Sequence, residues 1–164
     1  MTIGEGNIKN RAIALLLIGS AMLSTFSVFA EPTKSAKQAK DVTQFRQAIL
    51  KLVKNNLGAV GAINKVAIPF DVETMKTNSL RLGQLSLKLE DYFKTETSSF
   101  NDKTEALDKI WGNQADFNDK VSNLTAAASN LNKVAMGGDT SQFKPAIKQL
   151  FKSCKGCHDN YKKD

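Results

Sequence analysis

Apolar residues recur at spacings of three and four along most of the chain, beginning near Asp41. This is the spacing of residues on one face of an α-helix, and no stretch shows the two-residue alternation of a half-buried β-strand. The pattern predicts four helices, over residues 41–65, 71–93, 110–135 and 143–161. Because the helices are amphipathic and most connections are short, we expect an all-α fold, an antiparallel four-helix bundle.

The third and fourth predicted helices have the clearest apolar seams, since spacings of four and three alternate along them. The seam of the third helix consists of Ile110, Gln114, Phe117, Val121, Leu124, Ala128, Leu131 and Ala135. The seam of the fourth consists of Phe143, Ile147, Leu150, Cys154, Cys157 and Tyr161. A narrow seam is typical of left-handed helix packing, so we expect both sets to face a shared core.

Several residues predict where the helices begin and end. Asp71 follows Pro69-Phe70 and is expected to cap the start of the second helix. Gly137-Gly138 predicts the end of the third helix, and Asp139 with Gln142 resembles a capping box for the fourth. Residues 31–40 are polar and contain a proline, which predicts a flexible lead-in before a folded domain over residues 41–164.

Residues 1–30 have the features of a secretory signal peptide. Lys9 and Arg11 form a basic start, residues 12–20 are apolar, and Val28-Phe29-Ala30 offers small residues for cleavage. The apolar run is short for a membrane-spanning helix and ends without a basic cluster. We therefore expect cleavage, a periplasmic location in a bacterium and no membrane attachment afterwards. An uncleaved membrane anchor is the alternative.

The fourth predicted helix contains Cys154-Lys155-Gly156-Cys157-His158, the C-x-x-C-H pattern of c-type haem attachment. Two thiols three residues apart lie on one helical face and can add to the vinyl groups of one haem, while the next residue, His158, ligates the iron. The chain has two cysteines and one histidine, so no second ligand pair exists for a zinc site. We predict one covalent haem c per chain; a Cys154–Cys157 disulfide is the alternative.

The expected second protein ligand to the iron is a methionine, because the chain has a single histidine. Met1 and Met22 fall in the predicted signal peptide. Met75 fits the apolar seam of the second helix, where methionine commonly fills a core, and Met136 lies at the glycine-rich end of the third. The sequence therefore favours iron with an open distal side. A six-coordinate, low-spin electron carrier ligated by Met75 or a lysine is the alternative.

Three segments together resemble cytochrome c′, a family of c-type cytochromes with a four-helix bundle. These segments are Phe45-Arg46-Gln47-Ala48-Ile49-Leu50, Lys109-Ile110-Trp111 and Cys154-Lys155-Gly156-Cys157-His158-Asp159-Asn160-Tyr161. The resemblance covers residues 43–162. It implies that Leu50 lies over the distal haem face, and that Arg46 and Gln47 contact the haem propionates. Since Leu50 cannot ligate iron, it also implies high-spin, five-coordinate haem.

The function that this resemblance implies is the binding of small gases, nitric oxide and carbon monoxide, with electron transfer as a further role. It also implies a homodimer through the first two helices, to which Leu57, Ile63 and Leu87 would contribute. Many family members have an arginine four residues after the histidine, where this chain has Lys162. Lysine keeps the charge but lacks the planar guanidinium, so the proximal selectivity attributed to that arginine is not implied here.

The formal net charge is +7, and most of the cations are lysines. Lysines 144, 148, 152 and 155 would line the fourth helix, where they either form a solvated face or steer an acidic redox partner. No platform of basic and aromatic residues predicts nucleic-acid binding. No histidine remains to activate a nucleophile, so we expect no enzyme. A haem-free helical interaction protein is the remaining alternative class.

Overall fold

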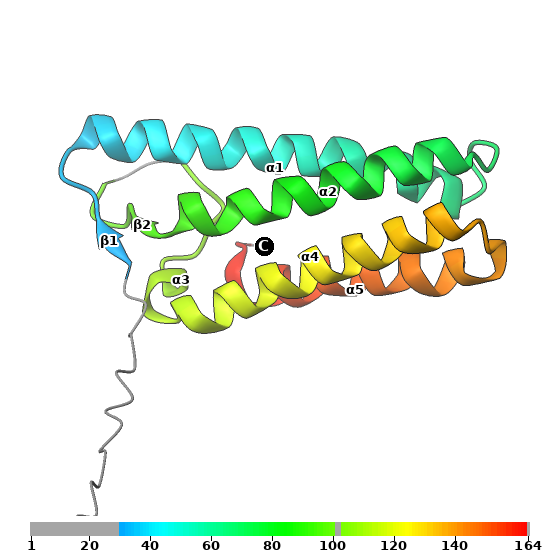
Figure 1. The fold of residues 1–164 in the computed structure, drawn as a ribbon. Helices are drawn as coiled ribbons and strands as arrows, with labels where there is room; N and C mark the ends of the chain where they lie inside the picture. The colour runs from blue at the N-terminus through cyan, green and yellow to red at the C-terminus, as the bar shows by residue number, and fades with distance from the viewer. Residues whose placement is uncertain (1–29, 101–102, 164) are drawn as a thin grey trace, which may run out of the picture.

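The computed structural model describes residues 30–100 and 103–163, so the predicted signal peptide lies outside the described residues except for Ala30. Four long helices dominate this part of the chain: α1 (Ala36–Asn64), α2 (Val72–Phe93), α4 (Gln114–Gly137) and α5 (Phe143–Tyr161). They lie side by side in two layers, α1 with α2 and α4 with α5 (Figure 1). The prediction of an all-α four-helix bundle is confirmed. No helix among the described residues has the length and apolar character needed to span a membrane.

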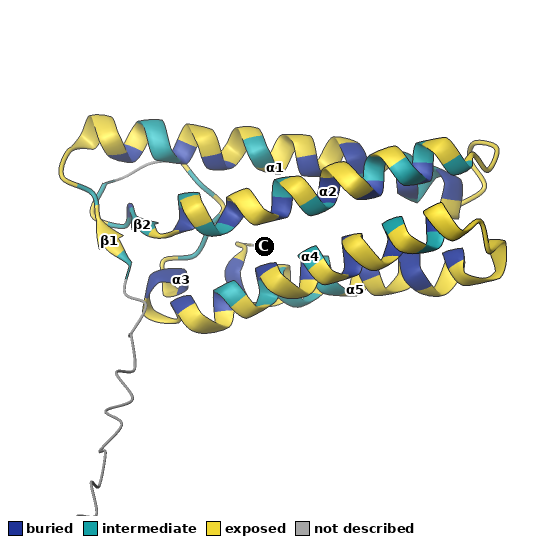
Figure 2. Ribbon diagram, viewed as in Figure 1, coloured by how far each residue is buried: buried dark blue, intermediate teal, exposed yellow. Residues whose placement is uncertain are grey.

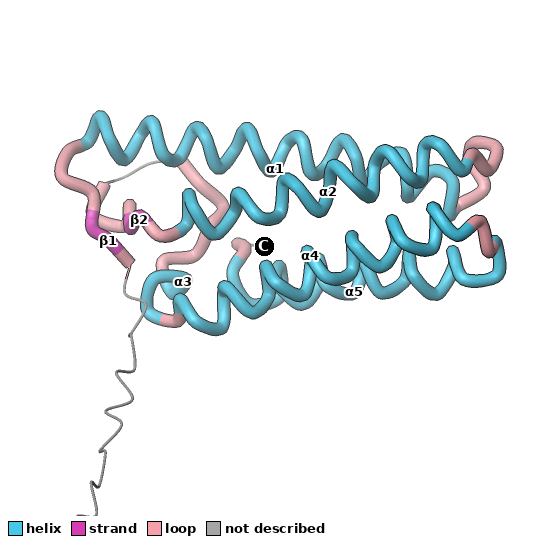
Figure 3. Tube along the Cα trace, viewed as in Figure 1, coloured by secondary structure: helices cyan, strands magenta, loops and turns pink. Residues whose placement is uncertain are grey.

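The four helices do not pack equally on one another. α1 packs along α2, α2 along α4, and α4 along α5, whereas α1 and α5 make few contacts. Loops join the helices at both ends of the bundle (Figure 3), and the end of α2 meets the start of α4 through Phe93 and Phe117, whose ring centroids are 4.8 Å apart. Neighbouring helices therefore run antiparallel, and the pair of α1 and α5 is the least closed side of the bundle.

The first helix begins earlier than the predicted residue Asp41. Ser35 has extended backbone angles, and its hydroxyl accepts a hydrogen bond from the Gln38 amide at 3.2 Å, which caps α1. Residues 36–40 are alanine, lysine and glutamine, which all favour helix. Before this cap, β1 (Glu31–Pro32) pairs in parallel with β2 (Thr95–Glu96). The predicted lead-in is therefore a short strand and the first turn of α1.

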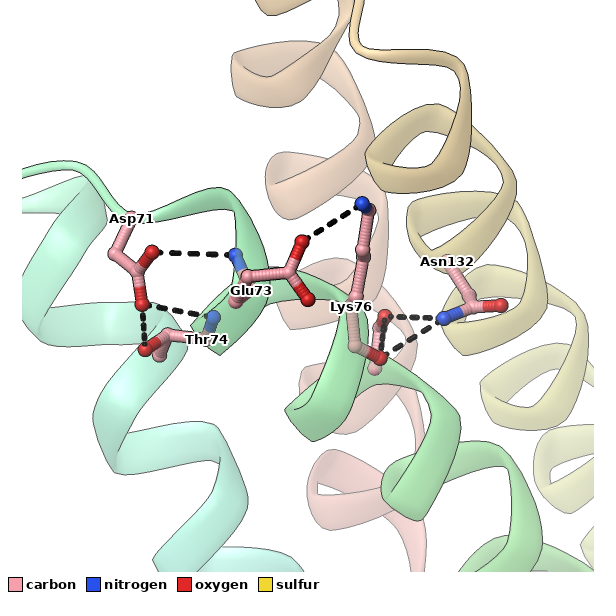
Figure 4. A network of polar contacts seen from close by, with 6 residues as sticks. Asp71, Glu73, Thr74, Lys76 and Asn132 are labelled. Atoms are coloured by element: carbon pink, nitrogen blue, oxygen red, sulfur yellow. Dashed lines mark hydrogen bonds and ion pairs between the residues drawn. The ribbon is translucent and has the colours of Figure 1, made fainter.

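Asp71 caps α2 as predicted. Its carboxylate accepts hydrogen bonds from the backbone amides of Glu73 and Thr74 at 3.2 and 2.9 Å, and the Thr74 hydroxyl also donates to it (Figure 4). These bonds satisfy amides that have no partner inside the helix. One turn later, the Asn132 side chain of α4 donates to the Lys76 carbonyl at 2.9 Å, so the start of α2 is fixed to α4.

The connections around α4 differ in detail from the prediction. A short helix, α3 (Lys109–Gly112), precedes α4, and the two are separated at Asn113, whose side-chain amide donates to the Lys109 carbonyl at 3.1 Å. This local bond competes with helix continuation. Gly138 ends α4 with a positive φ of 71°, as predicted for a glycine stop.

The predicted capping box for α5 is wrong. Asp139 accepts from the Ser141 amide at 3.0 Å and caps η1 (Thr140–Gln142), a short 3₁₀ helix that leads into α5. Gln142 makes no side-chain cap for α5. The predicted bounds of α5, residues 143–161, are confirmed.

The predicted seams form the core. Figure 2 shows the buried positions as stripes along each helix. All eight seam residues predicted for the third helix are buried, although the first of them lies on α3. In α2, the seam is completed by Ser79 and Ser86, both fully buried, whose hydroxyls donate to backbone carbonyls one turn earlier. The seam of α5 is also buried, with the exception of its two cysteines.

Candidate functional site

A chain of contacting side chains fixes the relative height of α1 and α5. The Arg46 guanidinium of α1 lies 4.7 Å from the centre of the Phe93 ring. Phe93 contacts Phe117 at 4.8 Å, and Phe117 contacts Tyr161 of α5 at 5.4 Å between ring centroids. Arg46 and Tyr161 therefore lie in the same cross-section of the bundle, at the end where α2 finishes and α4 begins.

The next cross-section contains Leu50 and the two cysteines. Leu50 lies one turn along α1 from Arg46, and Cys157 lies one turn back along α5 from Tyr161, so antiparallel helices bring them to the same height. Leu50 is 42% exposed although Arg46 and Val53, its neighbours in the seam, are 3% and 7% exposed. Cys154 and Cys157 are only half-buried. We call Leu50, Cys154 and Cys157 the open layer.

The open layer exists because α1 and α5 approach each other closely at a different place. A Cβ atom at Gly61 would lie 3.3 Å from Cζ of Phe151, so these helices touch near the C-terminal end of α1. Closer to Leu50 they make few contacts. Protein atoms thus leave three apolar seam residues partly uncovered on adjacent helices. Apolar surface left uncovered beside a core is a feature of ligand-binding grooves.

The thiols of the open layer are free and neutral around pH 7. Burial raises the pKa of the Cys154 thiol. Burial, followed by the nearby Cys154, raises the pKa of the Cys157 thiol to about 11. Both side chains pack against the hydrophobic core on one side, while the adjacent His158 is exposed. Two thiols on one helical face beside an accessible imidazole are the donor set that a covalently attached haem requires, so these residues fit that group.

Arg46 is buried and holds the end of α2. Its Nε donates to the Tyr92 carbonyl at 2.9 Å, Nη1 donates to the Thr97 hydroxyl at 2.9 Å, and Nη2 donates to the Thr95 carbonyl. The carbonyls at a helix C-terminus lack intrahelical hydrogen-bond partners. Arg46 is such a partner for the Tyr92 carbonyl. Gln47 is exposed, and its side-chain amide donates to the Lys103 carbonyl at 2.9 Å. Contact of either residue with haem propionates stays a prediction.

Trp111 fills the core beneath Arg46. It is 9% exposed, its indole N–H donates to the Phe93 carbonyl at 3.2 Å, and its ring lies 5.2 Å from the Arg46 guanidinium. The residue therefore joins α3 to the end of α2 and to α1. It supports the cross-section that precedes the open layer.

A polar group beside Cys157 was not found from the sequence. The Tyr161 hydroxyl donates to the Asp116 carboxylate, which also lies 3.2 Å from Nζ of Lys120. The Tyr161 hydroxyl, followed by Lys120, lowers the pKa of Asp116, while burial and Asp116 raise the pKa of Tyr161. The spacing of Asp116 and Lys120 predicts a helical ion pair, but only the fold brings Tyr161 to it.

The segment after α5 is fixed to the loop before α3. The Leu107 amide donates to the Tyr161 carbonyl at 3.0 Å, and the Lys163 amide donates to the Glu105 carbonyl at 2.7 Å. Nζ of Lys162 lies 3.1 Å from the Glu105 carboxylate, in a largely exposed ion pair. Lys162 is thus directed towards Glu105.

Neither methionine of the bundle lies in the open layer. Met75 is fully buried in the first turn of α2, and the neighbouring Ser79 accepts from Asn132 of α4 at 3.1 Å. From Phe117, near the open layer, to Asn132 is about 22 Å along the helix axis, at 1.5 Å per residue. Met136 is 67% exposed at that same distant end of α4. Met75 is a core residue, and the described fold gives no support to methionine ligation beside Cys157.

These features define a class: helical-bundle c-type cytochromes, in which a C-x-x-C-H motif lies in the last helix beside an open layer of the core. Comparison with known proteins gives the family. The family model described as Cytochrome C′ matches residues 41–162. The chain therefore belongs to the cytochrome c′ family.

Individual relatives agree with this assignment. The chain is 30% identical to cytochrome c′ of Rubrivivax gelatinosus over 74% of this chain and 94% of the relative. The solved cytochrome c′ of Shewanella frigidimarina is 36% identical, with a TM-score of 0.71 over 80% of this chain and 99% of that one. A leucine-to-alanine variant of cytochrome c′ from Alcaligenes xylosoxidans, solved as a nitric oxide complex, is 27% identical, with a TM-score of 0.68 over 77% and 96%.

Proposed function

We propose that this protein is an exported haem protein that binds small uncharged gases, nitric oxide and carbon monoxide, at an iron with an open distal side. The observation that carries the proposal is the open layer, in which Leu50 of α1 is exposed and both cysteines of α5 are only half-buried. Family membership and the signal-like segment at residues 1–30 support it. The proposed location is the periplasm, where haem is attached to c-type cytochromes.

Each residue of the site has a proposed role. Cys154 and Cys157 would hold one haem c through two thioether bonds. His158 follows Cys157 directly and is exposed on α5, so its imidazole is accessible as the proximal ligand. When bound, the haem supplies an iron with one coordination position left for a gas. Since the chain has one histidine and neither Met75 nor Met136 lies in the open layer, no other strong protein ligand is assigned.

Leu50 would determine which ligands the distal side accepts. Its side chain is apolar and offers no hydrogen bond, so ligands that depend on a polar donor, such as oxygen, gain no stabilisation there. Nitric oxide and carbon monoxide need no such donor. The nitric oxide complex of the Alcaligenes xylosoxidans relative supports this choice of ligands. With its single histidine assigned to iron, the protein is proposed to bind ligands and transfer electrons, not to act as a hydrolytic enzyme.

A homodimer through α1 and α2 is part of the proposal. Leu52 of α1 and Leu80 and Leu87 of α2 are 52%, 52% and 61% exposed, which leaves apolar side chains on the outer surface of this layer. Ile63 is 7% exposed and belongs to the core, so the expectation that it contributes to an interface is corrected. Leu57 is half-buried against the core. Leu87 is the predicted interface residue that remains accessible.

Absorption spectroscopy tests the proposal. Protein prepared from the periplasm should show covalently bound haem, with a broad high-spin spectrum in the oxidised and reduced forms that shifts when nitric oxide is added. A sharp low-spin spectrum that ignores the gas would contradict an open iron and favour a six-coordinate electron carrier. Protein without covalent haem, even when co-expressed with a haem-attachment system, would contradict the proposal as a whole.

A further inference from the structure

The charges of the bundle are distributed unequally between its helices. α1 and α5 together contain nine lysine or arginine residues and two aspartates. α2 and α4 together contain five basic and five acidic residues. The positive excess of the long helices therefore lies entirely on the two that carry the open layer. A single-sign field over one side of a protein attracts and orients molecules of opposite charge.

A hollow lies within this basic side, between the C-terminal end of α1 and the first turns of α5. Its volume is about 500 Å³, and its lining consists of Gly61, Asn64, Lys65, Lys144, Lys148 and Phe151. Lys65 follows α1, whereas Lys144 and Lys148 are one turn apart on α5. Lysines from two different elements thus line one space.

The three lysines of the hollow differ from those lysines of the bundle that are paired with carboxylates. Lys76, Lys88, Lys120 and Lys155 each form an ion pair with a carboxylate three or four residues away on their own helix. Among the residues that the structure describes, Lys65, Lys144 and Lys148 have no carboxylate within the 4.0 Å ion-pair distance. Their charge is therefore available to a partner.

Phe151 gives the hollow an apolar wall. It is 37% exposed and lies against Gly61 at the point where α1 and α5 touch. A carboxylate side chain that enters the hollow would place its methylene groups against this ring and its charge among the ammonium groups. Concave positions with an aromatic wall are typical anchors of protein interfaces.

We propose that the α1–α5 face, defined by Lys65, Lys144, Lys148, Lys152 and Phe151, docks an acidic surface of a redox partner protein, with a partner carboxylate seated in the hollow. The α5 lysines from 144 to 155 extend over about 16 Å of helix, longer than a small anion spans. Lys152 and Lys155 flank Cys154, so a partner seated here lies beside the haem-attachment motif. Electron exchange with that partner rests on the proposed function, whereas the docking itself does not.

The test uses the protein purified after export and a fluorescein-labelled oligoglutamate peptide as the acidic probe. Binding is followed by fluorescence anisotropy at low and at physiological ionic strength. The variant Lys65→Gln/Lys144→Gln/Lys148→Gln removes the charges of the hollow. The matched control Lys76→Gln/Lys88→Gln/Lys133→Gln removes the same number of charges from α2 and α4. Phe151→Ala is a third variant that leaves the charge unchanged.

The wild-type protein should bind the peptide in a salt-sensitive manner. The hollow variant should bind the peptide about tenfold more weakly or worse, whereas the affinity of the control should change by about twofold or less. This difference is expected because complementary charges act mainly at short range. Phe151→Ala should also weaken binding. Equal losses in both triple variants would mean attraction by net charge alone and would overturn the proposal, as would binding that neither variant affects.

Phosphatidylglycerol vesicles separate a protein partner from a membrane surface. Vesicle binding that depends on the three lysines, without peptide binding, would overturn the proposal in favour of a lipid headgroup site. The absorption spectrum of each sample reports haem content independently. Loss of peptide binding in a protein with gas-sensitive haem would contradict the docking proposal alone. Peptide binding by a protein without haem would contradict the proposed function alone.

Discussion

Leu50 lies four residues after Arg46 and three before Val53 on α1, yet 42% of its surface is exposed. Its seam neighbours Arg46 and Val53 are buried, so the local sequence of α1 does not explain the exposure. On α5, Cys154 and Cys157 also interrupt a buried seam. Leu50, Cys154 and Cys157, the three residues of the open layer, are therefore all incompletely buried.

Leu50→Ala should increase the association rate of carbon monoxide with the reduced protein, because it removes the apolar side chain that covers the distal side. The loss of stability should stay below about 1 kcal/mol, whereas Leu82→Ala, at a fully buried position, should cost about 2–5 kcal/mol. Flash photolysis and urea unfolding measure the two effects. Leu52→Ala, on the outer surface of α1, is the control, and equal rates in the Leu50 and Leu52 variants would contradict this role.

Asp116 should make stability depend on acid. Its folded pKa lies below the ordinary value of 3.8 because the Tyr161 hydroxyl and Lys120 stabilise the carboxylate. A depressed pKa contributes stability above the unfolded value, and that contribution is lost as the pH falls through the folded value. Asp116→Asn should therefore lower the urea midpoint at neutral pH, and the difference from wild type should shrink below about pH 4.

The control for this acid effect is Asp119→Asn, at another exposed position of α4. This variant should follow the wild-type midpoint at both pH values. A midpoint difference for Asp116→Asn that is independent of pH would show that the Tyr161 contact acts through packing, and not through the charge of the carboxylate.

At the scale of the elements, the sequence predicts much of the bundle because helix formation and burial depend on local spacing. The seams of α2 and α4, the Asp71 cap and the Gly138 stop follow from residues within a few turns of one another. The start of α1 was missed because the polar residues 36–40 carry no apolar pattern, and their helix depends on the Ser35 cap. The pairing of β1 with β2 joins segments far apart in the chain, and no local rule predicts it.

The candidate site divides in the same way. Cys154, Cys157 and His158 form a contiguous motif, so the sequence alone places them together on α5. The contacts of Arg46 with Tyr92 and Thr95 and the position of Tyr161 beside Asp116 require tertiary packing. The resemblance to cytochrome c′ identified Leu50, but its exposure relative to its neighbours is visible only in the fold.

The contact between Gly61 and Phe151 predicts a difference between two glycines of α1. Gly58→Ala should stabilise the protein by about 0.5–1 kcal/mol, because alanine favours helix and its Cβ meets no atom within 4 Å. At Gly61, a Cβ would lie 3.3 Å from the Phe151 ring, which must then move. Gly61→Ala should gain less than Gly58→Ala or lose stability. Equal thermal shifts in the two variants would contradict a close approach of α1 and α5.

At the scale of the whole molecule, Leu87 tests the proposed dimer. Its exposed side chain lies on the outer surface of α2, so Leu87→Glu would place a charge in an interface through α1 and α2 without disturbing the core. Sedimentation velocity should show a dimer for the wild type and a monomer for Leu87→Glu. Lys133→Glu, on α4, changes the charge in the same direction outside this layer and should leave the dimer intact.

The unequal charge of the helix pairs also gives the molecule a permanent electric moment, with its positive pole on the side of α1 and α5. A negatively charged surface would therefore not adsorb the protein at random. On an electrode coated with carboxylates, the molecules would settle with α1 and α5 towards the coating. The arrangement of lysines along two helices thus predetermines which side of the protein an electrode would contact.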